Sequence, residues 1–117
     1  PLVQGLLTGT IGPERTFDGD DMRRENPRFQ PEYLKRVADF LADLKPITDR
    51  HHITPGQLAI AWTLLEPGAT HVLVGARTPE QVRENAAAAD LELDADDRAV
   101  LSEAMRKHWP EEVAAVI

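Results

Sequence analysis

Apolar residues recur at helical spacing over residues 31–50 of the chain. They follow one another at steps of three, one, three and three positions: Leu34, Val37, Ala38, Leu41 and Leu44. Those steps place the side chains on one stripe of an α-helix. Pro31 suits the first turn of this helix, where its missing N–H costs little. Pro46 lies inside the stretch and is expected to kink or end the helix.

Two further helices are predicted, each beginning at a capping sequence. Thr54-Pro-Gly-Gln57 combines a capping hydroxyl, a proline at the first helical position and a glutamine three residues after the cap. The apolar stripe that follows is Leu58, Ala61, Trp62 and Leu65. Asp94 is the predicted cap of a helix from Ala95 to about His108. Its apolar face carries Val100, Leu101, Ala104 and Met105.

A short apolar run separates these helices. Residues 71–77, His-Val-Leu-Val-Gly-Ala-Arg, are read as a buried strand that ends in a glycine turn. Thr78-Pro-Glu-Gln81 then repeats the capping sequence, at the start of a helix that ends by Asp90. The apolar start, residues 2–7, is read as the tail of another strand. The order strand, helix, helix, strand, helix, helix predicts an α/β protein.

The segment between the first strand remnant and the first helix, residues 10–30, is predicted to be a loop. Glycines, prolines and a mixed run of charges interrupt it, and a loop of this length is usually a lid or disordered. Asp18, Asp20 and Asp21 lack the glycine and the distal glutamate of a calcium loop. His51 and His52 have no third ligand in range. No metal site is therefore predicted.

Composition narrows the classes of partner. The chain has 117 residues, within the range of one small domain, and a formal net charge of −7 without a basic cluster. That charge argues against nucleic acid or an anionic membrane as a partner. The chain has no cysteine, and no apolar run reaches the length of a membrane span. These features fit a cytoplasmic location. The start at Pro1 suggests a processed or truncated product.

The predicted strand, turn and helix over residues 71–85 form a candidate binding site for a phosphorylated nucleotide. The start of a helix presents unpaired N–H groups and the positive end of the helix dipole. Arg77 adds a cation and a planar hydrogen-bonding fork, and Gln81, Glu84 and Asn85 follow on the nearby side of the helix. Spacing alone favours an ordinary strand-turn-helix with a solvated arginine, because no GxGxxG or Walker motif is present. Gln81 also has a competing role as a cap partner.

The residues themselves resemble a known family. Gly75-Ala-Arg-Thr-Pro-Glu-Gln-Val-Arg-Glu-Asn85 is similar to the last cofactor-binding segment of the aldo-keto reductases. Pro1-Leu-Val-Gln-Gly-Leu-Leu-Thr-Gly9 looks like that family's Ser-Pro-Leu-x-x-Gly-x-Leu-x-Gly loop. Asn26-Pro-Arg-Phe29 and Thr54-Pro-Gly-Gln-Leu-Ala-Ile-Ala-Trp62 stand where the family carries similar runs. The resemblance covers nearly the whole chain, in the family's order.

The resemblance implies a fold. Aldo-keto reductases are (β/α)8 TIM barrels, which need eight strand-helix units and roughly 250 residues. Residues 1–117 therefore look like the carboxy-terminal strand-helix units of such a barrel, truncated and helix-rich if seen alone. Residues 1–30 would be a cofactor loop and flap, 31–66 two helices, 71–90 a strand and cofactor-binding helix, and 94–109 the carboxy-terminal helix. The tail, 113–117, would lie over the substrate mouth. The remainder of the barrel is expected in cis or as another chain.

The resemblance also implies a chemistry. The family transfers a hydride from NADPH to a carbonyl carbon, while a tyrosine tuned by Lys and Asp protonates the oxygen and a His orients the carbonyl. None of these four residues maps onto this chain, so no catalytic residue is predicted. Tyr33 is the one tyrosine and stands in no matching motif.

Cofactor contacts can be carried over residue by residue. Four residues would lie along the pyrophosphate: Leu2, Val3, Gln4 and Gly5. The adenosine phosphate would meet Gly75, Ala76 and Arg77, with Arg77 on the 2′-phosphate that separates NADP from NAD. The phosphate and the adenine edge would contact Gln81, Glu84 and Asn85. Thr10 stands where the family often has lysine, so one cationic contact is expected to be missing.

Three hypotheses follow. In the first, the chain is the NADP-binding part of an aldo-keto reductase acting on a small aldehyde or ketone, and the fragment alone is inactive. In the second, it belongs to a non-catalytic, cofactor-binding regulatory subunit of the same fold. In the third, it is a small helical interaction domain, which would unfold cooperatively by itself.

Overall fold

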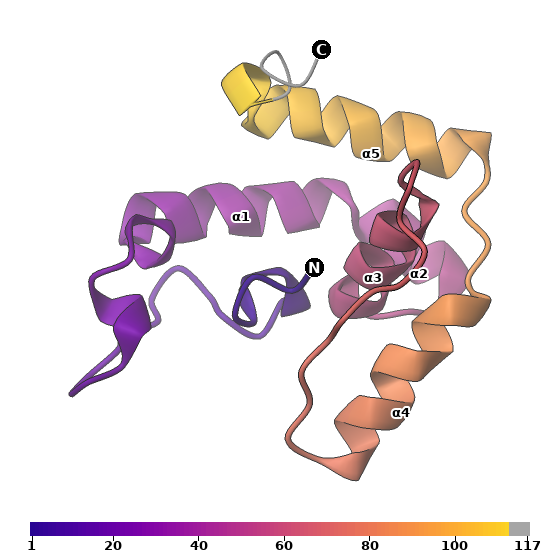
Figure 1. The fold of residues 1–117 in the computed structure, drawn as a ribbon. Coiled ribbons are helices and arrows are strands. Elements are labelled where there is room, and N and C mark those ends of the chain that lie inside the picture. Colours follow the sequence, from indigo (N-terminus) through magenta and orange to yellow (C-terminus); the bar gives the residue numbers. More distant parts are fainter. Residues whose placement is uncertain (113–117) are drawn as a thin grey trace.

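The first long helical stretch breaks where the proline predicts. The computed structural model describes residues 1–112; the predicted tail, 113–117, lies outside the described part. Helix α1 spans Pro31–Asp43 and helix α2 spans Lys45–His51, with Leu44 between them. Pro46 stands in the first turn of α2, where its missing N–H costs little. The predicted break at this proline is therefore confirmed (Figure 1).

Helices α3, Pro55–Leu65, and α5, Ala95–His108, begin at the predicted caps. Thr54 and Gln57 form a reciprocal capping box, in which the Gln57 amide donates to Thr54 Oγ1 (3.2 Å) and the Thr54 amide to Gln57 Oε1 (3.0 Å). Asp94 and Asp97 form a second box, at 2.9 and 3.2 Å. Each box satisfies two N–H groups that the helix itself cannot pair.

Helix α4, Pro79–Ala87, begins after Thr78 and runs into the short 3-10 helix η4, Ala88–Asp90. In the described residues, α4 lies apart from α1 and α5, and contacts α3 (Figure 1). None of the side chains in α4 is buried. The helix is therefore exposed on most of its surface and depends on α3 for its position.

The loop predicted over residues 10–30 folds onto the helices through two aromatic side chains. Phe17 and Phe29 are both buried and pack edge to face, with ring centroids 5.4 Å apart. The guanidinium of Arg23 lies 4.5 Å from the centroid of the Phe17 ring. Three short 3-10 helices occur before α1: η1 Leu6–Thr8, η2 Met22–Arg24 and η3 Pro27–Phe29.

The core lies where α1, α3 and α5 meet. Its most deeply buried side chains are Leu34, Val37, Leu58 and Leu101. The apolar stripes predicted for α3 and α5 match the buried residues only in part, with the differences at their margins. Val100 and Leu65 are 38% and 37% exposed, whereas Ile60 is 3% exposed although it lies off the predicted stripe. Helix α3 is apolar nearly all round, so hydrophobicity alone does not select its buried face.

The strand predicted over residues 72–74 does not form. Residues 71–77 carry no strand assignment, and no β-strand occurs anywhere in residues 1–112. Val72 and Val74 are half-buried, while Leu73 between them is 90% exposed. A strand needs a neighbour to pair its N–H and C=O groups, and the described residues offer none. The α/β prediction is thus not confirmed, whereas the prediction of a helix-rich chain is.

An open apolar hollow lies beside this extended segment. Its volume is ≈ 390 Å³, and α3, the extended segment and α4 all contribute to it. The apolar residues that line it are Ile60, Leu64, Val72, Val74, Ala76, Val82, Ala86 and Ala89. Alternate residues of the extended segment thus face one side, as they would in a half-buried strand.

Charged residues join α5 to the other helices. Asp97 is 2% exposed and accepts a hydrogen bond from His51 Nε2 at 2.8 Å. Arg50 forms ion pairs with both Asp97 and Asp94. At the other end of α5, Asp43 pairs with Lys107 and His108. Two clusters of charge therefore fix α5 against α2 and against the end of α1.

Two negative findings apply to residues 1–112. None of the helices there combines the length and the apolar character that crossing a membrane requires. No group of three or more His, Cys, Asp or Glu side chains is placed to hold a metal ion in that part of the chain.

Candidate functional site

The turn before α4 is built by its own side chains. Thr78 Oγ1 accepts a hydrogen bond from the Gln81 amide at 3.2 Å. Gln81 Oε1 in turn accepts one from the Arg77 amide at 2.7 Å. The Gln81 side chain is expected from the sequence to reach back to the cap itself, but it bonds one residue beyond it, so α4 has no reciprocal capping box. This hydrogen bond fixes the backbone of Arg77 against the first turn of α4.

Few N–H groups remain free at this helix start. Thr78 accepts from the amides of Gln81 and Val82, and Pro79 has no N–H to offer. The Glu80 amide has no hydrogen bond within the described residues. The positive end of the helix dipole is still present. An anion here would therefore depend on the dipole, one amide and the neighbouring cation.

Arg77 is that cation. Its side chain is exposed, and within residues 1–112 its guanidinium forms neither an ion pair nor a hydrogen bond. A planar guanidinium with all its donors available suits a phosphate better than an ammonium group does, because it can form two parallel hydrogen bonds. The arrangement can therefore bind a phosphate group from solvent.

Gly75 and Asn85 complete the turn. Asn85 Nδ2 donates to the Gly75 carbonyl at 3.4 Å, which joins the second turn of α4 to the end of the extended segment. A Cβ added at Gly75 would have no atom within 4 Å. The protein's own packing thus leaves open space over Gly75, as binding of an external molecule against this backbone requires. Two hydrogen bonds thus tie the segment of Gly75 and Arg77 to the first two turns of α4, through Gln81 and Asn85.

Glu84 points elsewhere. Its Oε1 accepts a hydrogen bond from the Thr54 hydroxyl at 2.8 Å, and its backbone carbonyl accepts one from Gln57 Nε2 at 2.9 Å. The carboxylate predicted to meet the adenine edge is therefore already bound to the start of α3. Sequence reasoning missed Thr54 and Gln57 as partners of α4. The repeated Thr-Pro-x-Gln sequence, at 54–57 and again at 78–81, accounts for the start of each helix but carries no signal for this contact.

The other predicted segment, residues 2–5, forms a tight turn in a rarely occupied conformation. Val3, Gln4 and Gly5 have φ values of 49°, 56° and 91°. A β-branched residue in the left-handed region is strained, and such strain often accompanies a functional site. Val3 and Gln4 are exposed. The side chain of Leu2 approaches Gly56 at the start of α3, 3.7 Å from the position a Cβ would take there.

Both predicted segments therefore contact the first turn of α3. The turn of residues 2–9 approaches Pro55 and Gly56, since a Cβ at Gly9 would lie 3.2 Å from Pro55 Cγ. Helix α4 approaches it from another side, through the Glu84 hydrogen bonds. Thr10, the position of the missing lysine, exchanges a hydroxyl hydrogen bond with Thr8 at 2.7 Å. The ligand contacts assigned to the two segments stay predictions.

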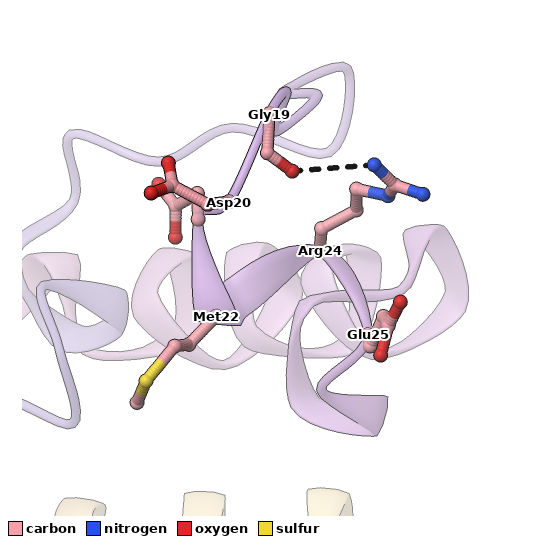
Figure 2. A pocket seen from close by; sticks show the side chains of 6 residues that line it. Gly19, Asp20, Met22, Arg24 and Glu25 are labelled. Carbon is pink, nitrogen blue, oxygen red and sulfur yellow. Dashed lines mark hydrogen bonds between the residues drawn. The ribbon is translucent and has the colours of Figure 1, made fainter.

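A second hollow, of ≈ 220 Å³, lies in the loop before α1 (Figure 2). Arg24 lines it and donates to the Gly19 carbonyl at 3.2 Å, while Met22 points away from Gly19 with 78% of its surface exposed. Hydrogen bonds from Arg23 lower the pKa of Asp21 to about 2. This acid is thus paired with an arginine and is unsuited to act as a proton carrier near neutral pH.

Tyr33 lacks the surroundings of a catalytic phenol. Its half-buried ring lies 6.3 Å from that of Trp109, and Arg36 lies over it at 5.8 Å. No lysine and no histidine donates a hydrogen bond to it in the described residues. The geometry gives no reason to assign it a role in proton transfer.

Comparison with known proteins covers most of the chain. A sequence model of the aldo/keto reductase family matches residues 1–106. An uncharacterized oxidoreductase of Mycobacterium tuberculosis is 41% identical over 110 residues, which are 94% of this chain and 33% of that protein. An NADH-specific methylglyoxal reductase of Escherichia coli is 40% identical over 103 residues, 88% of this chain and 31% of that protein.

A further relative carries a different cofactor in its name. The NADP(+)-labelled aldo-keto reductase yakc of Schizosaccharomyces pombe is 31% identical over 93 residues, 80% of this chain and 27% of that protein. The chain spans about a third of the length of the curated relatives that it matches. The family match extends over both predicted cofactor segments and over the helices that support them. The chain therefore belongs to the aldo/keto reductase family.

Proposed function

We propose that this chain is the NADP-binding part of an aldo-keto reductase that transfers a hydride between NADPH and a small aldehyde or ketone. The observation that carries the proposal is the turn before α4. There the guanidinium of Arg77 has no partner within residues 1–112 and lies beside the open backbone of Gly75 and the positive end of a helix. A phosphate is the ligand that this donor set fits.

Arg77 would hold the 2′-phosphate of NADP, and Gly75 and Ala76 would lie against the adenosine phosphate. Asn85 and Gln81 would flank the same end of the cofactor. The strained turn of residues 2–5 would lie along the pyrophosphate. When bound, the nicotinamide supplies the hydride; the residues of this chain would bind and orient the cofactor.

The choice between NADP and NAD rests on Arg77. The names of two relatives differ on this point, since one is NADH-specific and the other is labelled with NADP(+). An unpaired arginine at the ribose end adds binding energy to a cofactor that carries a 2′-phosphate and adds little to one that lacks it. This reasoning supports NADP for the present chain.

The rest of the barrel would supply the reacting groups. The chain covers about a third of its relatives, and the apolar hollow beside residues 71–77 is a face that neighbouring strands of a barrel would cover. The tyrosine, lysine, aspartate and histidine of the family would come from that other part. Residues 1–117 alone would therefore have no reductase activity.

Two proteins test the proposal: residues 1–117, and the complete protein expressed from its whole reading frame. Oxidation of NADPH is followed by absorbance with a series of small aldehydes and ketones. The complete protein is expected to bind NADPH and to consume it, and residues 1–117 to consume none. Turnover by residues 1–117 would contradict the placement of the catalytic groups. Cofactor binding without turnover by the complete protein would assign it to a regulatory subunit.

A further inference from the structure

The first turn of α3 lies between the two segments that are proposed to bind the cofactor. On one side, the backbone of Thr8 and the side chain of Leu2 approach Gly56, both within 4 Å of the position a Cβ would take. On another side, Thr54 and Gln57 donate hydrogen bonds to Glu84 of α4, at 2.8 and 2.9 Å. One helical turn thus contacts both segments, which are about 70 residues apart in the sequence.

Each of the two polar residues has a double role there. The Thr54 hydroxyl accepts from the Gln57 amide and donates to the Glu84 carboxylate. The Gln57 side chain accepts from the Thr54 amide with its oxygen and donates to the Glu84 carbonyl with its nitrogen. The capping box of α3 is therefore also the set of donors that holds α4. Only a side chain with both an acceptor and a donor can act in this way at position 57.

These hydrogen bonds hold α4 itself, whereas η4, which directly follows it, packs on α3 through the buried side chain of Ala88. None of the side chains of α4 is buried, and the extended segment before it has no paired strand in residues 1–112. The Gln57 bond goes to the backbone of α4, one residue before Asn85, which itself holds the Gly75 carbonyl. A shift of α4 along α3 would therefore move Asn85, Gly75 and Arg77 relative to residues 2–5.

We propose that Thr54 and Gln57 are positioning residues for the cofactor: they fix α4 against α3, so that the turn of Arg77 and the turn of residues 2–5 are held at the separation that one dinucleotide spans. This inference rests on the proposed function. It assigns to the capping box of α3 a role in binding in addition to its role in starting a helix.

The variant Gln57→Glu separates the two roles. A glutamate still accepts from the Thr54 amide, and its charge is favourable at the start of a helix, so α3 keeps its cap. It has no donor for the Glu84 carbonyl, so the hydrogen bond to α4 is lost. The dissociation constant of NADPH for the complete protein is expected to rise about three- to tenfold, the equivalent of one hydrogen bond. The kcat of the reduction is expected to stay unchanged.

Two controls accompany this variant. Gln30→Glu makes the same chemical change at an exposed glutamine whose Nε2 also donates to a backbone carbonyl, that of Arg24 at 3.0 Å, and should change the dissociation constant less than twofold. The second control is the pair Thr54→Val and Thr54→Ser, which, unlike Gln57→Glu, does not change the charge. Valine deletes the hydroxyl, and with it both the cap of α3 and the bond to Glu84, and should weaken binding, whereas serine keeps both and should leave binding unchanged.

Amide hydrogen exchange of the protein without cofactor gives a readout that does not depend on binding. In Gln57→Glu the amides of α4 are expected to exchange faster, with those of α3 unchanged. If the unsubstituted protein binds NADPH and Gln57→Glu binds it equally well, the positioning role is wrong and the proposed function stands. If the unsubstituted protein binds neither NADPH nor NADH, the proposed function and this inference both fail.

Discussion

Replacing Arg77 with alanine in the complete protein is expected to raise the dissociation constant of NADPH about 100-fold and that of NADH by less than about threefold. Hydrogen bonds between a guanidinium and a phosphate are each worth about 1.5–3 kcal/mol, and about 2.7 kcal/mol corresponds to a factor of 100 in affinity. NADH has no 2′-phosphate and loses only a weak, long-range attraction. Titration of cofactor fluorescence with each nucleotide measures both constants.

Arg83→Ala is the matched control for this substitution. Arg83 lies on α4, which begins directly after the turn of Arg77; its side chain is 75% exposed, and it approaches Glu80 at 3.6 Å. Its loss removes the same charge but no proposed contact, so neither constant should change more than about twofold. Equal losses of NADPH and NADH affinity in Arg77→Ala would contradict the proposed contact between Arg77 and the 2′-phosphate.

Asp97→Ala is expected to lower the free energy of unfolding by about 3 kcal/mol. The carboxylate is 2% exposed, accepts hydrogen bonds from His51 and from the Asp94 amide, and pairs with Arg50. Its loss leaves two side chains and one amide without their shared partner at the junction of α2 and α5. Urea unfolding of the complete protein measures the change. Asp96→Ala, at the exposed neighbouring acid, should cost less than about 0.5 kcal/mol.

The loss in free energy of unfolding caused by Asp97→Ala should depend on pH in a known direction. Burial by itself raises the pKa of Asp97, but hydrogen bonds from His51, Arg50 and the Asp94 amide outweigh it and hold the pKa below its usual value. A carboxyl with a lowered pKa stabilises the fold above the pKa of the unfolded chain, which is about 3.9. That contribution disappears as the pH falls through the pKa of the folded state.

The difference between the unsubstituted protein and Asp97→Ala should accordingly be complete at neutral pH and shrink below about pH 4. Unfolding titrations at several pH values between neutral and acid check this. A difference that stays constant to the lowest pH would show that Asp97 acts by packing and not by charge.

Local features of the fold are predictable from the sequence because their causes are local. The caps at Thr54, Thr78 and Asp94 and the break at Pro46 each depend on residues within one helical turn. The buried face of α3 is not predictable in this way. Its sequence is apolar on nearly every side, so the choice of Ile60 over Leu65 depends on which helices pack against it.

The strand is wrongly predicted, and one contact of the site is missed, for the opposite reason. Both depend on residues that are distant in the sequence. The apolar alternation of residues 72–74 predicts a strand, but strand formation needs a partner that residues 1–112 do not contain. The contact of Gln81 with Arg77 spans only four residues, but it goes one residue beyond the cap to which the sequence assigns Gln81. The hydrogen bond between Thr54 and Glu84 spans 30 residues, and no periodicity in the sequence reports it.

The central claim is that the turn before α4 binds the phosphorylated end of a dinucleotide. A crystal structure of the complete protein with NADP bound tests it most directly. The account predicts the 2′-phosphate on the guanidinium of Arg77, with the pyrophosphate along residues 2–5. A cofactor whose phosphates contact neither Arg77 nor residues 2–5 would contradict it.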